Sequence, residues 1–229
     1  MFPIRDSARS GKIPFITWTI ILVNLIVFLK ELFAPDPESF IRQYALVPKT
    51  VDFLNPISLF PFLSSLFLHA GWIHLLSNLW FLKIFGDNVE ATLGHLKFLF
   101  FYLLWGIAAG LTQYLFLLNS SIPMLGASGA IAGVLGAYMV LFPYSKIEVL
   151  IPTYGFLTKA LIPAPFMLFY WFFAQLFNGT ASIVTGTAAV GGVAWWAHAG
   201  GFVAGYLTAK VFSKKQKRDE VLYPDEIWL

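Results

Sequence analysis

The sequence predicts an all-α membrane protein, a bundle of six transmembrane helices with a long loop between the first two. Composition, apolar runs and charge placement all lead to this fold class. Of the 229 residues, 58% are hydrophobic and only 12% are charged, and the mean hydropathy is +0.73. A soluble domain typically carries about a quarter charged residues and just under half apolar ones. The composition therefore favours a chain whose main partner is the lipid bilayer.

The second observation is the number of apolar runs. A helix needs about 20 predominantly apolar residues to cross the hydrocarbon core of a bilayer. The fourth run is shorter than this and lies between Pro123 and Pro143, and the fifth contains Pro163 and Pro165 near its start. The predicted spans are residues 13–33, 67–85, 97–118, 127–142, 158–177 and 188–212.

The third observation is the placement of positive charge at both ends of the chain. Six spans put both termini on one side, and basic flanks mark that side as cytoplasmic. We therefore expect a multi-pass protein of the plasma (inner) membrane, in which residues 1–12 are a cytoplasmic N-terminus, 13–212 the membrane domain and 213–229 a cytoplasmic tail. Seven basic residues divided between the two ends of the chain are not typical of a nucleic-acid binding surface. They are Arg5, Arg9, Lys12, Lys214, Lys215, Lys217 and Arg218.

The loop of residues 34–66 is rich in proline but also carries apolar stretches such as residues 57–62. Such a segment is expected to lie in the membrane interface, although an ordinary connector is an equally good interpretation. The chain contains no cysteine, which excludes disulfides, thiolate chemistry and cysteine-based zinc sites.

Polar residues inside predicted spans are costly and usually face the protein interior or water. His198 lies about ten residues into the last span, beside a small-residue face made by Ala197, Gly201 and Gly205. The fourth span offers a matching face that includes Gly126 and Gly129, and Ser128 lies next to it. Faces of this kind usually mean only tight helix packing, and a lone histidine is often only a hydrogen-bonding partner. Two such helices, however, would bring Ser128 and His198 together as nucleophile and base.

Two further polar residues lie early in the second predicted span. His74 and Asn78 are four residues apart and share one helix face. Both can donate hydrogen bonds to an oxyanion, but they could equally bond each other or a nearby loop. Ser128 lies at the N-terminal end of its helix, where free N–H groups and the helix dipole favour negative charge.

The remaining polar residues limit the catalytic mechanisms that the chain could use. No Asp or Glu lies at the depth of these side chains, which predicts a Ser–His dyad without a third acidic member. The sequence has no H-E-x-x-H motif for zinc and no pair of membrane-depth aspartates. We therefore expect neither a metal nor another cofactor.

Four motifs together resemble the bacterial-type rhomboid family, which are intramembrane serine proteases with a six-helix core. They are Gly126-Ala127-Ser128-Gly129, Ala197-His198 with Gly201 and Gly205, His74-x-x-x-Asn78, and Gly86-Asp87-Asn88-Val89-Glu90 with Gly94.

The resemblance implies roles for these residues. Ser128 is the nucleophile, His198 the base, and His74, Asn78 and the Ser128 backbone N–H form the oxyanion hole. Gly126, Gly129, Gly201 and His69 support the site, and Glu90 is a structural hydrogen-bonding residue. The implied reaction is cleavage of other proteins' transmembrane segments in a water-filled cavity open to the outer side. The resemblance also implies that the fifth span acts as a side gate, although a plain lipid-facing aromatic surface is at least as good an interpretation of that span.

The chain departs from the family pattern at two places. It lacks a Trp-Arg pair in the loop of residues 34–66, and Ala132 replaces an aromatic residue that commonly packs on the catalytic histidine. Trp195 and Trp196 are candidates to orient His198 instead.

Two other functions remain open. A rhomboid-like protein that only binds membrane clients would typically lack the serine or the histidine, and both are present here. A transporter would show an inverted repeat and a buried carboxylate at the coupling site, neither of which is visible.

Overall fold

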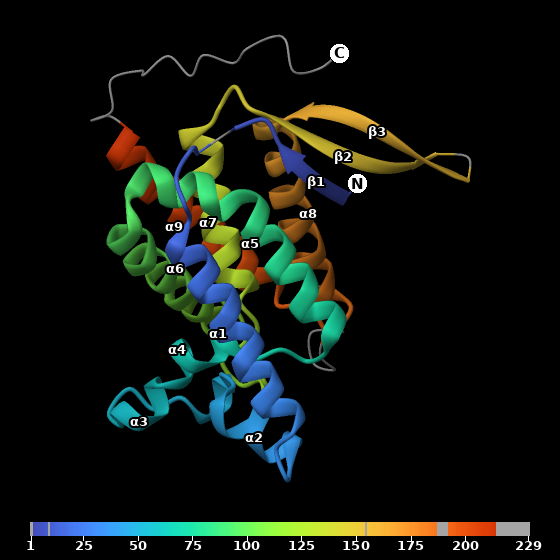
Figure 1. The fold of residues 1–229 in the computed structure, drawn as a ribbon. Helices are drawn as coiled ribbons and strands as arrows, with labels where there is room; N and C mark the ends of the chain where they lie inside the picture. The colour runs from blue at the N-terminus through green and yellow to red at the C-terminus, as the bar shows by residue number, and fades with distance from the viewer. Residues whose placement is uncertain (1, 9, 154, 187–191, 214–229) are drawn as a thin grey trace.

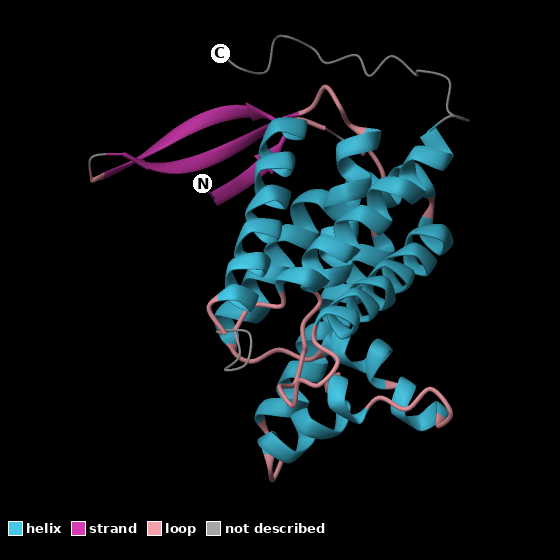
Figure 2. Cartoon of the chain, turned by 180° about the vertical axis from the view of Figure 1, so that it is seen from behind, coloured by secondary structure: helices cyan, strands magenta, loops and turns pink. Residues whose placement is uncertain are grey.

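The computed structural model describes residues 2–8, 10–153, 155–186 and 192–213. A long helix lies within or beside each of the six predicted spans, and these helices pack as one bundle (Figures 1 and 2). The long helices are α1 (Phe15–Leu32), α5 (Trp72–Leu93), α6 (His95–Phe116), α7 (Ser128–Leu141), α8 (Ala164–Val184) and α9 (Trp195–Ser213).

Fewer helices than six meet the length and hydropathy expected of a membrane crossing. Among the described residues α1, α6 and α8 do so, and residues 56–93 add a fourth crossing if their two parts, bent by 80°, count as one span. Helix α7 is apolar but has only 14 residues. The structure therefore supports three to four spans on these grounds.

The all-α prediction missed a three-stranded antiparallel sheet. Strands β1 (Phe2–Asp6), β2 (Lys146–Thr153) and β3 (Phe156–Pro163) lie in the order β1-β2-β3. In Figure 1 the sheet lies at the top of the bundle and the β2–β3 hairpin projects beyond it. The fifth predicted span was wrong at its start, because residues 158–163 belong to β3 and α8 begins only at Ala164. Proline disfavours a helical residue before it and is well tolerated in a first helical turn, which suits Pro163 and Pro165.

The N-terminal segment is not a free tail, since residues 2–6 form β1 and are attached to the bundle. The indole nitrogen of Trp80 donates to the carbonyl of Pro3 at 2.7 Å. The side chain of Asp6 accepts hydrogen bonds from Asn88 on α5 and Tyr138 on α7. The tail of residues 214–229 and the start of the last predicted span at residues 188–191 lie outside the described residues.

The side chain of Glu90 is 0% exposed although it lies near the end of α5. Its carboxylate accepts hydrogen bonds from the backbone N–H groups of Ile16 and Thr17 at 2.8 and 2.7 Å. These N–H groups belong to the first turn of α1, which has no partner for them within its own helix. Glu90 therefore caps α1 and holds it against α5, in the structural role that the resemblance implied.

Helix α7 is the centre of the bundle, with every residue from Gly129 to Tyr138 buried. Its glycines meet those of α9 so closely that a Cβ atom on Gly205 would overlap the carbonyl oxygen of Gly133, and one on Gly201 that of Gly129. Small residues at a helix interface permit this backbone approach. The approach places the N-terminal end of α7 beside that of α9.

The loop between α1 and α5 folds at the opposite end of the bundle from the sheet (Figure 1). It contains α2 (Pro37–Tyr44), α3 (Pro56–Leu59) and α4 (Pro61–Ser64), with short 3-10 turns at Pro48–Thr50 and Ser65–Phe67. Buried Phe62 and Leu66 pack against Gly110 and Gly106 of α6, whereas Leu54 and Ile57 are almost fully exposed. The placement of this loop in the membrane interface stays a prediction.

Candidate active site

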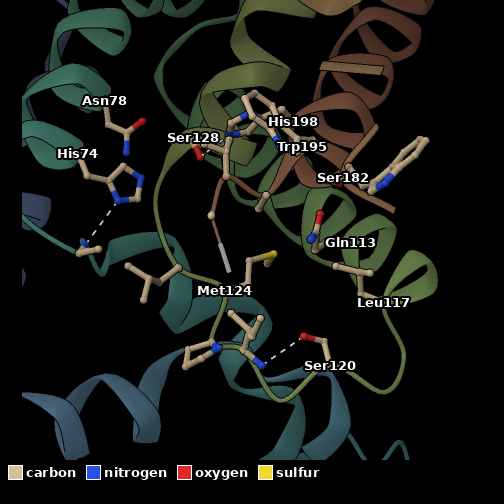
Figure 3. A pocket seen from close by; sticks show the side chains of 18 of the residues that line it. His74, Asn78, Gln113, Leu117, Ser120, Met124, Ser128, Ser182, Trp195 and His198 are labelled. Atoms are coloured by element: carbon tan, nitrogen blue, oxygen red, sulfur yellow. Dashed lines mark hydrogen bonds between the residues drawn. The ribbon is translucent and has the colours of Figure 1, made fainter. Parts of the chain in front are cut away.

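Ser128 and His198 form a hydrogen-bonded pair between the two close-packed helices. Ser128 is the first residue of α7, and His198 lies in the first turn of α9 because that helix begins at Trp195. The Ser128 Oγ and His198 Nε2 atoms are 2.7 Å apart, and Figure 3 shows the two side chains facing each other. A hydroxyl beside an imidazole nitrogen at this distance is the arrangement that a general base needs to activate a nucleophile.

The other face of the His198 ring contacts residues of α8 and α9. Nδ1 of His198 lies 2.8 Å from Oε1 of Gln175. The Trp171 ring lies 5.8 Å from the His198 ring, centroid to centroid, and the Trp195 ring meets it edge-on at 6.4 Å. Trp196, the alternative candidate, instead stacks on Phe116. Trp171 and Trp195 thus provide the aromatic contacts to His198 that Ala132 does not.

Sequence reasoning missed two buried glutamines at this site. Besides Gln175 on α8, Gln113 on α6 accepts a hydrogen bond from the backbone N–H of Ala197 at 3.0 Å and so caps the start of α9. Both lie inside predicted spans, where a polar side chain is costly. The rule that singled out Asn78 would have found both glutamines had it been applied to uncharged amides throughout the spans.

His74 and Asn78 lie on the α5 side of the dyad. Nδ1 of His74 accepts a hydrogen bond, at 3.4 Å, from the backbone N–H of Ala70, which leaves Nε2 as the proton-bearing nitrogen of the neutral ring. Gly126 has φ of 123°, and a Cβ atom there would lie 2.8 Å from His74 Nε2. Asn78 Nδ2 is buried and has no hydrogen-bond partner among the described residues. Both side chains thus offer a donor near Ser128.

His69 does not contact the dyad. Its side chain is buried, and neither ring nitrogen has a hydrogen-bond partner in the part of the chain that the structure describes. The ring packs edge-on against His74 with centroids 5.1 Å apart, and the backbone N–H of His69 donates to Glu31 at 3.2 Å. His69 therefore packs against His74, while the buried carboxylate of Glu31 holds the turn before α5.

The dyad lies in a cavity of about 1090 Å³. The loops before α5, α7 and α9 line it, so the cavity lies at the end of the bundle away from the sheet. Its wall combines the polar groups above with apolar side chains such as Met124 and Trp72. A concave, mainly apolar site with a few convergent polar groups is the usual form of a substrate site. Over the described residues, no group of three or more His, Cys, Asp or Glu side chains is arranged to hold a metal ion.

Several curated proteins similar to this chain are named for eukaryotic organelles. The chain is 34% identical over 133 residues to a "Rhomboid-like protein 11, chloroplastic" of Arabidopsis thaliana, covering 56% of this chain and 44% of that protein. It is 34% identical over 137 residues to a "Rhomboid protein 1, mitochondrial" of Saccharomyces cerevisiae, covering 58% of this chain and 38% of that protein. The matches therefore span less than half of these relatives' lengths.

These relatives overturn the predicted location. From its sequence, the protein was expected to lie in a plasma (inner) membrane with both termini cytoplasmic. The two proteins above, and a "Presenilin-associated rhomboid-like protein A, mitochondrial" of Danio rerio that is 34% identical over 42% of this chain, are named for chloroplast or mitochondrion. These names refer to organelles and not to a plasma membrane. Basic flanks report the side on which termini lie relative to the insertion machinery, and they do not distinguish one membrane from another.

A family model described as "Rhomboid domain" matches residues 57–215. The matched segment includes α5 to α9, and with them Ser128, His198, His74 and Asn78. With this match over more than half of its length, the chain belongs to the rhomboid family.

Proposed function

We propose that this protein is an intramembrane serine endopeptidase that cleaves transmembrane segments of other proteins. The observation that carries the proposal is the 2.7 Å contact between Ser128 Oγ and His198 Nε2 in a cavity large enough for a peptide. The proposal includes a core of six transmembrane helices, α1 and α5 to α9, in an organellar inner membrane.

In the proposed reaction, Ser128 Oγ attacks the scissile carbonyl while His198 Nε2 takes the hydroxyl proton. The carbonyl oxygen becomes an oxyanion, which His74 Nε2–H, Asn78 Nδ2–H and the Ser128 backbone N–H stabilise. His198 then gives its proton to the departing amine, and an acyl group remains on Ser128. Water, deprotonated by His198, hydrolyses this ester and regenerates the serine.

The unpartnered amide of Asn78 supports the oxyanion assignment. A buried donor without a partner costs free energy in the resting protein, typically about 1–3 kcal/mol. Asn78 Nδ2 is such a donor among the described residues. A group left unsatisfied in the free protein and satisfied by the developing oxyanion stabilises the transition state selectively.

The proposal is tested by labelling the purified protein with a fluorophosphonate probe, which reacts with activated serines and requires no known substrate. Wild type is compared with Ser128→Ala and His198→Ala in lipid nanodiscs. We expect label on wild type only, at Ser128 by peptide mass mapping. The wild-type rate should exceed that of His198→Ala by about 10³-fold or more, because the hydroxyl loses its base.

Equal labelling of wild type and His198→Ala would contradict the proposed mechanism, as would label at another serine. Ser77→Ala provides the matched control. Ser77 also lines the cavity, but its hydroxyl donates to the His74 carbonyl, whereas the Ser128 hydroxyl faces the His198 imidazole. This variant should label like wild type.

A further inference from the structure

We infer that Gln175 is a positioning residue of the active site, which fixes the tautomer and the orientation of His198 through a hydrogen bond to Nδ1. The inference rests on the proposed function. It assigns a specific role to α8, a helix that carries neither the nucleophile nor the base.

The hydrogen bonds of Gln175 determine which way its amide faces. Its side chain is 5% exposed, Nε2 donates to the carbonyl oxygen of Trp171 at 3.1 Å, and Oε1 lies 2.8 Å from His198 Nδ1. A backbone carbonyl can only accept a hydrogen bond, so the NH₂ end of the amide has to face Trp171. The amide oxygen therefore has to face His198.

This orientation determines which imidazole nitrogen carries the proton. An amide oxygen only accepts, so the contact is a hydrogen bond only if Nδ1 of His198 bears hydrogen. A neutral imidazole has one such hydrogen, and Nε2 is then left with a lone pair. Nε2 faces the Ser128 hydroxyl. Gln175 thus selects the tautomer that can accept the serine proton.

A neutral acceptor suits a site within the membrane. In soluble Ser-His-Asp enzymes an aspartate holds the histidine in the correct tautomer. A buried carboxylate in a low-dielectric site carries a large desolvation cost, and an amide oxygen gives the same direction to the Nδ1–H bond without that cost. The Trp171 ring, one helical turn before Gln175 on α8, packs beside the same imidazole. Together they restrain His198 where Ala132 provides no aromatic ring.

The three groups come from three helices, Ser128 from α7, His198 from α9 and Gln175 from α8. The geometry of the base therefore depends on α8 packing against α9. Displacement of α8 would remove the acceptor from Nδ1 without moving the nucleophile.

The test compares rate constants for fluorophosphonate labelling of Gln175→Leu and Gln175→Glu with wild type across pH 5–9. We expect Gln175→Leu to label about 10- to 100-fold more slowly, the loss typical of one buried neutral hydrogen bond. Gln175→Glu retains an acceptor and adds charge that favours the imidazolium. It should label within about threefold of wild type at the pH optimum, with the acidic limb of its pH profile moved to higher pH.

Thr180→Val is the matched control. Thr180 lies on the exposed face of α8, and its hydroxyl donates to the Leu176 carbonyl of its own helix. Its rate and pH profile should equal those of wild type. A wild-type rate for Gln175→Leu would overturn the inference. Equal losses in Gln175→Leu and Gln175→Glu with unchanged pH profiles would also overturn it, because they would indicate packing alone.

A spectroscopic measurement keeps the inference testable if Gln175→Leu is unstable. The chain has four histidines, so ¹⁵N-histidine labelling gives a simple spectrum in which His198→Ala identifies the His198 signals. We expect neutral His198 to carry hydrogen on Nδ1 in wild type. Hydrogen on Nε2 instead would overturn the inference whatever the activity. Absence of Ser128-dependent labelling in wild type would overturn the proposed function, while this tautomer could still be read.

Discussion

At the scale of single residues, the candidate site combines the hydrogen-bonded pair Ser128 and His198 with side chains that contact it. In the proposed mechanism, this contact activates the hydroxyl. The proposed reactivity also depends on neighbours that hold the imidazole in place and on donors to the oxyanion. Removing a donor should therefore cost less than removing the nucleophile, because the remaining donors still act.

The variant Asn78→Ala tests this difference. We expect the labelling rate constant to fall by about 10²- to 10³-fold, the loss typical of one oxyanion donor, whereas Ser128→Ala abolishes labelling. Stability should not fall, since Asn78 Nδ2 has no partner among the described residues to lose. Labelling rates and thermal unfolding midpoints of both variants provide the measurement. Destabilisation of Asn78→Ala with an unchanged rate would assign Asn78 a structural role instead.

At the scale of elements, the backbone contact between α7 and α9 sets the position of the dyad. In an ordinary helix, Gly→Ala is stabilising by about 1 kcal/mol. Here Gly205→Ala should destabilise the protein by at least about 1–3 kcal/mol, since the new Cβ overlaps the Gly133 carbonyl and the helices must separate. The unfolding free energy, measured by denaturant titration in mixed micelles, checks this prediction.

Val203→Ala is the control for this packing prediction. Val203 lies two residues from Gly205 on the exposed face of α9, and its truncation should change the unfolding free energy by less than about 0.5 kcal/mol. An unfolding free energy of Gly205→Ala equal to that of wild type would show that α7 and α9 can separate without cost.

At the scale of the whole molecule, Asp6 joins three distant segments, β1, α5 and α7. Burial, assisted by the nearby charge of Asp87, raises the pKa of Asp6 from 3.8 to about 7. Between about pH 4 and pH 7 the folded protein keeps a proton that the unfolded chain has lost. The contribution of Asp6 to stability is thus full below pH 4 and lost as the pH rises to 7.

This linkage predicts that ionisation of Asp6 lowers the thermal unfolding midpoint of the protein as the pH is raised from 5 to 8. Asp6→Asn keeps an acceptor for Tyr138 but has no proton to lose, so its midpoint should depend less on pH than that of wild type. Comparing the two proteins cancels the other titrating groups. Parallel pH dependences would show that the carboxyl of Asp6 titrates at an ordinary pH in the folded protein.

The sequence by itself determined the helical bundle and the residues that could react. A serine, a histidine and two glycine faces in separate apolar runs restrict the chemistry because polar groups are rare and costly in lipid. The sequence did not predict the sheet, because the end of β3 continues into α8 as one apolar run and was included in the fifth predicted span. The partner of the His198 Nδ1 atom was also decided by tertiary structure alone. Gln175 is 23 residues away along the chain and on another helix, and only the packing of α8 on α9 brings its amide oxygen to the imidazole.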